Sequence, residues 1–320
     1  MVGSQQRNVF LNGRPSPYDT PFIVIMLIIS MFVGWAAVDN LAYATIYMPL
    51  VLFSFVILIA GVAFKGRYVS EVVLGSIRNK SDWPRFYITI AITTVVSLAI
   101  AALLYYSVAS WLGLPFAIAQ VSNAPIAIII LTYSVFLVFI EAVFFFSTIL
   151  PTIIRGLHDT TLIAVISMIG AVVFYFFIQA TYVALALVAL AAIFIFSKLA
   201  NKEIAKTPVS QIFIGIIFVG VLWAFFHIPA YSAAPAGALL VSLGVAFVVF
   251  VLVAMLCVAL QNTIPAFGII GTIDATLLTM QLHAYWLYVT LPLIVFTGIF
   301  AAAIMIRISK SGAVSANPAV

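Results

Sequence analysis

Charged residues are scarce in this chain. Only 7% of its 320 residues are Asp, Glu, Lys or Arg, and 66% are hydrophobic, whereas a soluble domain has about 25% charged residues. Water therefore cannot be the solvent for most of the surface, which excludes a soluble globular protein. The apolar runs are continuous for about 20 residues and do not alternate with period two, which excludes an outer-membrane barrel. The composition predicts an all-α, polytopic membrane helix bundle.

Cysteine and histidine are scarce too. The single cysteine, Cys257, excludes an intrachain disulfide and a metal site built from cysteines. The three histidines argue against a bis-histidine haem site. The chain also lacks HExxH, a P-loop and a Gly-rich nucleotide fingerprint. We therefore expect no cofactor and no metal.

Ten apolar runs predict ten transmembrane helices. A polar tail, 1–20, precedes them and a second tail, 307–320, follows them. The first five helices fall within 21–178 and the last five within 181–306. The predicted helices lie near 21–38, 45–64, 86–107, 125–152, 160–178, 181–198, 209–229, 237–259, 264–281 and 285–306.

The basic residues predict the orientation of these helices. With the N-terminus in the cytoplasm, all thirteen Lys and Arg residues fall on the cytoplasmic side, as the positive-inside rule requires. The opposite side has Asp39 and almost no other charge. We therefore expect a multi-pass protein of the cell membrane with both termini in the cytoplasm. The net charge of +5 then reflects topology and some attraction to anionic lipid, and no nucleic-acid partner is expected.

The loop 65–85 is the longest predicted cytoplasmic segment between helices. Its stretch "YVSEVVLGSIRNK" is compatible with a short amphipathic helix that begins at Ser70 as an N-cap. Such a helix either lies on the membrane surface or docks a cytoplasmic protein partner. Its place between the second and third predicted helices is similar to that of the coupling helix in ABC-2-type permeases.

Three ionisable residues fall within or at the end of apolar runs. Glu141 lies near the middle of one predicted helix, Asp274 near the middle of another, and His227 at the outer end of a third. A charge at mid-bilayer costs about 2.5–3.5 kcal/mol or more, so each is a candidate functional residue. Each carboxyl group must be protonated or find a donor on another helix. The bundle then uses them either as hydrogen bonds between helices or as a polar cavity for proton transfer, ligand binding or hydrolysis.

Residues 209–280 resemble the C-terminal core of the CPBP family, the intramembrane CAAX-processing and bacteriocin-processing proteases. The family motifs are EExxxR, FxxxH and HxxxN or HxxxD. "WAFFHIPAY" is similar to the second motif, with Trp223 in place of the Phe and His227 as the His. "NTIPAFGIIGTIDATL" is similar to the segment of the third motif, with Asp274 at the Asp position and Ile270 at the His position. "EAVFFFSTILP" is similar to a first motif that keeps only Glu141, but it lies two helices too early to face His227 in the usual family order.

The missing residues decide what the resemblance implies. In the family a glutamate activates water while His and Asn or Asp orient it and stabilise the oxyanion. Loss of a general base typically forfeits 10²–10⁴-fold in rate, and loss of an oxyanion donor about 10²–10³-fold. We therefore assign no catalytic residue and expect a non-proteolytic binding, scaffolding or assembly subunit. Its candidate polar-pocket residues are His227, Asp274, Glu141 and Trp223, of which Trp223 and His227 share one helix face.

Other functions stay open at this point. If the chain is an enzyme, the resemblance implies an intramembrane endopeptidase of CAAX-processing type. A permease subunit, ABC-2-like or a secondary transporter, suits ten helices, although residues 1–178 and 181–320 lack the internal similarity of an inverted repeat. A membrane-embedded subunit of a respiratory or secretion complex is the third alternative.

Overall fold

A computed structural model describes six continuous ranges of the chain: 9–11, 82–106, 139–155, 160–176, 208–227 and 236–281. It also describes single positions at 22, 25, 29, 56, 60, 72, 73 and 75, and ten positions between 181 and 196. Within these residues the chain is helical and forms no strand. The helices are η1 (Val9–Leu11), α4 (Trp83–Tyr106), η6 (Phe139–Ile149), α6 (Leu150–Arg155), α7 (Thr160–Phe176), α9 (Pro208–Phe226), α10 (Ala236–Leu260) and α11 (Ile264–Gln281).

Three of the described helices contain segments that are long and apolar enough to cross a membrane. These segments are Trp83–Ile100, Pro208–Phe226 and Leu239–Leu260. The prediction of an all-helical protein is confirmed for the described residues, and the length and composition of these three segments support a membrane protein.

The described helices begin and end within a few residues of the predicted runs. α4, α7, α9, α10 and α11 match five of those runs, and η6 with α6 covers the end of the run 125–152. The runs 21–38, 45–64 and 181–198 are described only at single positions, and 285–306 lies outside the described residues. Of the expected amphipathic helix in loop 65–85, Val72 and Val73 are helical and Gly75 is in a turn.

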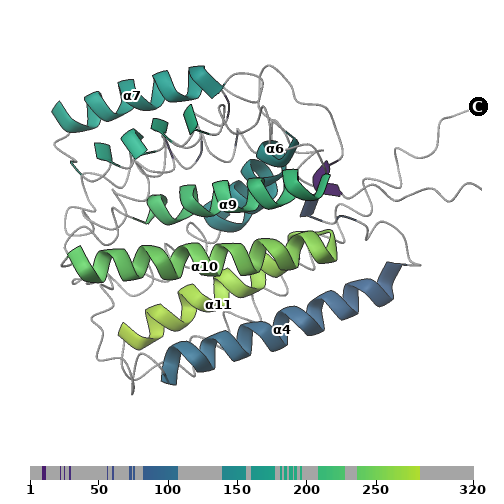
Figure 1. Ribbon diagram of the computed structural model, residues 1–320. Coiled ribbons are helices and arrows are strands. Elements are labelled where there is room, and N and C mark those ends of the chain that lie inside the picture. Colours follow the sequence, from purple (N-terminus) through teal and green to yellow (C-terminus); the bar gives the residue numbers. More distant parts are fainter. Residues whose placement is uncertain are drawn as a thin grey trace, which may run out of the picture.

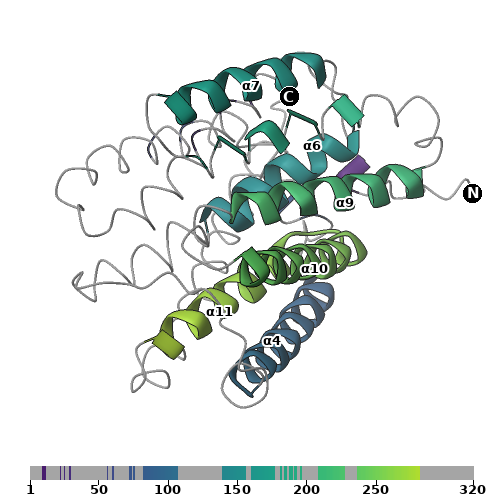
Figure 2. The same ribbon diagram turned by 60° about the vertical axis from the view of Figure 1, so that its left-hand side comes forward.

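The helices pack side by side in an order that differs from their order in the chain. α10 lies between α9 and α11, and α4 packs along α11 (Figure 1). α6 packs against α9. α7 and α4 lie on opposite sides of the described bundle in both views (Figure 2). η6, which precedes α6 and α7 in the chain, contacts both α9 and α11 and so lies between them.

Aromatic side chains fill the space between η6, α9 and α10. Phe146 stacks on Phe250 with ring centroids 4.4 Å apart, and Trp223 lies 5.7 Å from Phe250. The ring centroids of Phe145 and Phe226 are 5.3 Å apart. Buried aromatic pairs of this kind contribute about 0.5–1.5 kcal/mol beyond their area. These contacts join η6, the segment that carries Glu141, to α9 and α10.

A tight turn joins α10 to α11 and buries two polar residues. Gln261 adopts a left-handed φ of 57°, and the N–H of Asn262 donates to the carbonyl of Cys257 at 3.1 Å. This is the Schellman pattern that usually places Gly at the left-handed position. The Asn262 side chain then accepts from the Ile264 N–H at 3.1 Å, which caps α11. Thr263 is fully buried between the two helices.

α4 and α11 approach closely at Gly268. A Cβ on Gly268 would overlap the Thr93 Cγ2 methyl group and lie 3.9 Å from Ser97 Oγ. Small residues allow such close approach between helices in membranes, where van der Waals packing drives association.

We expect Gly268→Ala to destabilise the protein by about 1–3 kcal/mol, because the added methyl group forces the two helices apart. The measurement is thermal or denaturant unfolding in detergent. Gly244→Ala on α10 is the matched control, since its Cβ would meet no atom within 4 Å. A Gly268→Ala protein as stable as Gly244→Ala would contradict this packing.

Candidate functional site

Glu141 lies in the first turn of η6, which is a π-helix. Two hydroxyl groups bond back to carbonyls five residues earlier in this segment. Ser147 Oγ donates to the Ala142 carbonyl at 3.1 Å, and Thr148 Oγ1 donates to the Val143 carbonyl at 3.0 Å. π-helical turns are rare and frequently occur at functional sites. The wide turn and its hydroxyl bonds fix the position of Glu141 in the bundle.

His227 is held by the way in which α9 ends. Its backbone N–H donates to the Ala224 carbonyl at 3.0 Å, three residues back, so the last turn is tightened. The Trp223 carbonyl, four residues back, is left for the imidazole, whose Nδ1 lies 2.7 Å away. Because a carbonyl oxygen only accepts, Nδ1 carries a hydrogen. The other ring nitrogen, Nε2, therefore faces away from the helix end.

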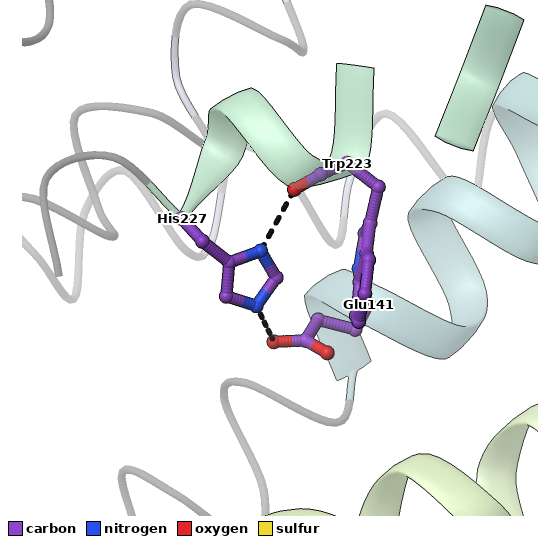
Figure 3. Close-up of polar contacts among 3 residues, drawn as sticks. All are labelled: Glu141, Trp223 and His227. Carbon is purple, nitrogen blue, oxygen red and sulfur yellow. Dashed lines mark hydrogen bonds and ion pairs between the residues drawn. The ribbon is translucent and has the colours of Figure 1, made fainter. Parts of the chain in front are cut away.

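Nε2 of His227 faces Glu141. The distance from Nε2 to Glu141 Oε1 is 3.6 Å, and the two side chains are 16% and 4% exposed. Figure 3 shows the imidazole between the Trp223 carbonyl and the Glu141 carboxyl group. Because Nδ1 makes the hydrogen bond to the Trp223 carbonyl, Nε2 is the ring nitrogen that is available to the Glu141 carboxyl group.

This contact corrects one expectation from the family order. The sequence comparison placed Glu141 two helices too early to face His227, and that expectation is wrong for this bundle. α6 continues directly from η6 and packs against α9. Glu141 thereby reaches the end of α9 although α7 separates the two in the chain. Spatial neighbours in a helix bundle need not be neighbours in the sequence.

Asp274 and Trp223 supply two further polar atoms. Asp274 lies on α11, which packs against η6, the segment that carries Glu141. Its Oδ2 atom is buried and has no hydrogen-bond partner in the described part of the chain. The Trp223 indole packs edge-on against His227, with ring centroids 4.4 Å apart. Its Nε1 atom is likewise buried and has no partner among the described residues.

Ile270 occupies the position of the family's third-motif histidine. It lies one turn before Asp274 on α11 and is 1% exposed. The apolar side chain can neither donate nor accept a hydrogen bond, so the site has no second imidazole at this position. No cluster of three metal-ligating side chains occurs in the described ranges, and Glu141, His227 and Asp274 do not form one.

A hydrogen bond that the sequence did not reveal connects the two helices that carry the carboxyl groups. Ser147 Oγ and Thr263 Oγ1 are 2.7 Å apart and both are fully buried. Ser147 follows Glu141 in η6, and Thr263 precedes α11. The bond therefore fixes the position of η6 along the axis of α11. The only available signal was a hydroxyl residue in each of two apolar stretches, which by itself names no partner.

Comparisons with protein families, with curated proteins and with solved structures find no match for this chain.

The Glu141–His227 contact predicts a measurable coupling. Glu141→Gln and His227→Gln each remove one member of this contact, and the double variant removes both. We expect a coupling free energy of about 1–3 kcal/mol in a double-mutant cycle of unfolding. Combining His227→Gln with Gly244→Ala, which shares no partner, should instead be additive. Additive behaviour of the Glu141 and His227 variants would show that the two side chains do not interact.

Proposed function

We propose that this membrane protein binds a polar group of a partner or substrate at Glu141, His227 and Asp274 without cleaving it. The observation that carries the proposal is a pair of buried polar atoms without a partner in the described part of the chain, one on Trp223 and one on Asp274. Trp223 Nε1 is a hydrogen-bond donor and Asp274 Oδ2 an acceptor, and both are buried without a partner among the described residues. Unsatisfied buried polar groups are costly, and a bound group that both accepts and donates a hydrogen bond would remove that cost.

The composition of the site favours binding over hydrolysis. Glu141 is engaged by His227 at 3.6 Å, and that contact competes with the activation of a water molecule. Ile270 stands where the resembled proteases have a histidine, and it is buried. A degenerate CPBP-like core that retains a polar centre but lacks the full catalytic set fits a binding, scaffolding or assembly subunit.

Hydrolysis is the second candidate function, and a single observation favours it. A carboxyl group within reach of an imidazole is an arrangement that general-base catalysis uses. If the protein is an enzyme, Glu141 is the base, and its substrate is a peptide within the membrane. The permease and complex-subunit alternatives depend on loop 65–85 as a docking segment, and most of that loop lies outside the described residues.

We also propose ten membrane spans with both termini in the cytoplasm. The placement of all thirteen basic residues on one side supports this topology. Gly75, in the loop 65–85, packs directly against the backbone of Gln261, in the turn between α10 and α11. The ten-span arrangement puts both segments on the cytoplasmic side. In a Cys257→Ala background, Ser4→Cys and Ser315→Cys should react with an impermeant thiol reagent only after the cells are opened; labelling of intact cells would contradict the topology.

The binding proposal predicts that Trp223→Phe and Asp274→Asn lose the bound molecule. Trp223→Phe removes the Nε1–H donor, and Asp274→Asn replaces one carboxyl oxygen with an NH2 group. With one hydrogen bond worth about 1.4 kcal/mol, retention should fall about tenfold. The measurement is native mass spectrometry of protein purified in mild detergent. Trp83→Phe is the matched control, because Trp83 lies at the exposed start of α4.

Two outcomes would contradict the proposal. One is equal retention of every co-purifying molecule by wild type, Trp223→Phe and Asp274→Asn. The other is peptide hydrolysis that disappears in Glu141→Gln or His227→Ala, which would favour the protease function instead.

A further inference from the structure

The face of α4 that packs on α11 is polar. Thr89, Thr93 and Ser97 follow one another at intervals of four residues and are 2%, 5% and 4% exposed. Residues four apart lie on one side of a helix, so the three hydroxyl groups form a single row. On the outer side of the same helix, Val95 and Leu98 are 67% and 55% exposed, as suits contact with lipid. The polar row therefore faces protein and not the membrane.

Two of these hydroxyl groups lack the hydrogen bond that Thr152 and Thr272 make. Thr152 and Thr272 donate to the carbonyls four residues earlier, at 2.7 and 2.6 Å, which is the usual solution for a hydroxyl inside a helix. Thr93 Oγ1 and Ser97 Oγ are buried and make no hydrogen bond to any described residue. Buried polar atoms in native proteins nearly always have a partner, and bound water supplies it where protein does not.

Thr93 and Ser97, one turn apart on α4, both lie at the close approach to Gly268. The Thr93 Cγ2 methyl group occupies the place that a Gly268 Cβ would take, and Ser97 Oγ lies 3.9 Å from that position. The hydroxyl groups of Thr89, Thr93 and Ser97 are uncharged. A ligand here is therefore neutral, small and able both to donate and to accept hydrogen bonds.

We infer that water binds between α4 and α11, with Thr93 Oγ1 and Ser97 Oγ as its side-chain ligands. A buried water typically makes 2–4 hydrogen bonds, and these two hydroxyls supply two of them. This site is separate from the one at Glu141 and does not depend on the proposed function. It places water against α11, the helix that carries Asp274.

Isosteric substitutions test the site through the sign of their effect on stability. In a dry interface Thr93→Val and Ser97→Ala would remove an unsatisfied hydroxyl and raise the melting temperature. In a hydrated interface they remove a ligand of the bound water, so we expect each to lower the melting temperature by about 2–4 °C. Thr152→Val is the matched control, because its hydroxyl is already satisfied within its own helix. An unchanged or raised melting temperature for both variants would overturn the inference.

A second measurement keeps the test decisive if the variants fold poorly. Solid-state NMR of wild-type protein in lipid detects transfer of magnetisation from water protons to labelled side chains. We expect rapid transfer to the Thr93 side chain and none to Val95, which lies two residues along the same helix and is 67% exposed on its lipid-facing side. Absence of transfer to Thr93 would also overturn the inference.

Discussion

The contact between Glu141 and His227 is the interaction on which the interior of this bundle depends. A bilayer supplies no water to a buried carboxyl group, so the protein must provide a proton or a counter-charge from another helix. The imidazole at the end of α9 provides it, 3.6 Å from the carboxyl oxygen. The ring is itself fixed by the Trp223 carbonyl, which the tightened last turn of α9 leaves available. One backbone irregularity thus determines which ring nitrogen meets the glutamate.

The other side of the contact depends on a second irregularity. The π-helical turn of η6 carries Glu141, and hydroxyl groups of Ser147 and Thr148 bond to its carbonyls. Ser147 also bonds to Thr263, next to the start of α11. Aromatic rings from η6, α9 and α10 pack against one another beside this arrangement. A buried hydrogen bond therefore links the two segments that carry the carboxyl groups of Glu141 and Asp274.

Much of the helical structure follows from the sequence, and the reason is physical. An apolar run must be helical to satisfy its backbone inside a membrane, and Pro208, Pro265 and Asn262 mark helix starts. The bounds of α4, α7, α9, α10 and α11 therefore agree with the predicted runs within a few residues. Three of the four polar-pocket candidates, Glu141, His227 and Asp274, could be named because ionisable residues are rare in such runs. The contact between Glu141 and His227 could not be predicted, because it depends on how α6 packs against α9. It also depends on a π-helical turn that no residue pattern in the sequence predicts.

The central claim is that Glu141 and His227 meet in the folded protein. The chain has three histidines and only three glutamates, Glu71, Glu141 and Glu203, so selective labelling resolves the question. Solid-state NMR on protein with ¹⁵N-histidine and ¹³C-glutamate, reconstituted in lipid, measures the dipolar coupling between imidazole nitrogens and carboxyl carbons. The structure predicts one strong coupling that is lost in Glu141→Gln. Absence of any such coupling in the wild-type protein, or its persistence in Glu141→Gln, would contradict the account.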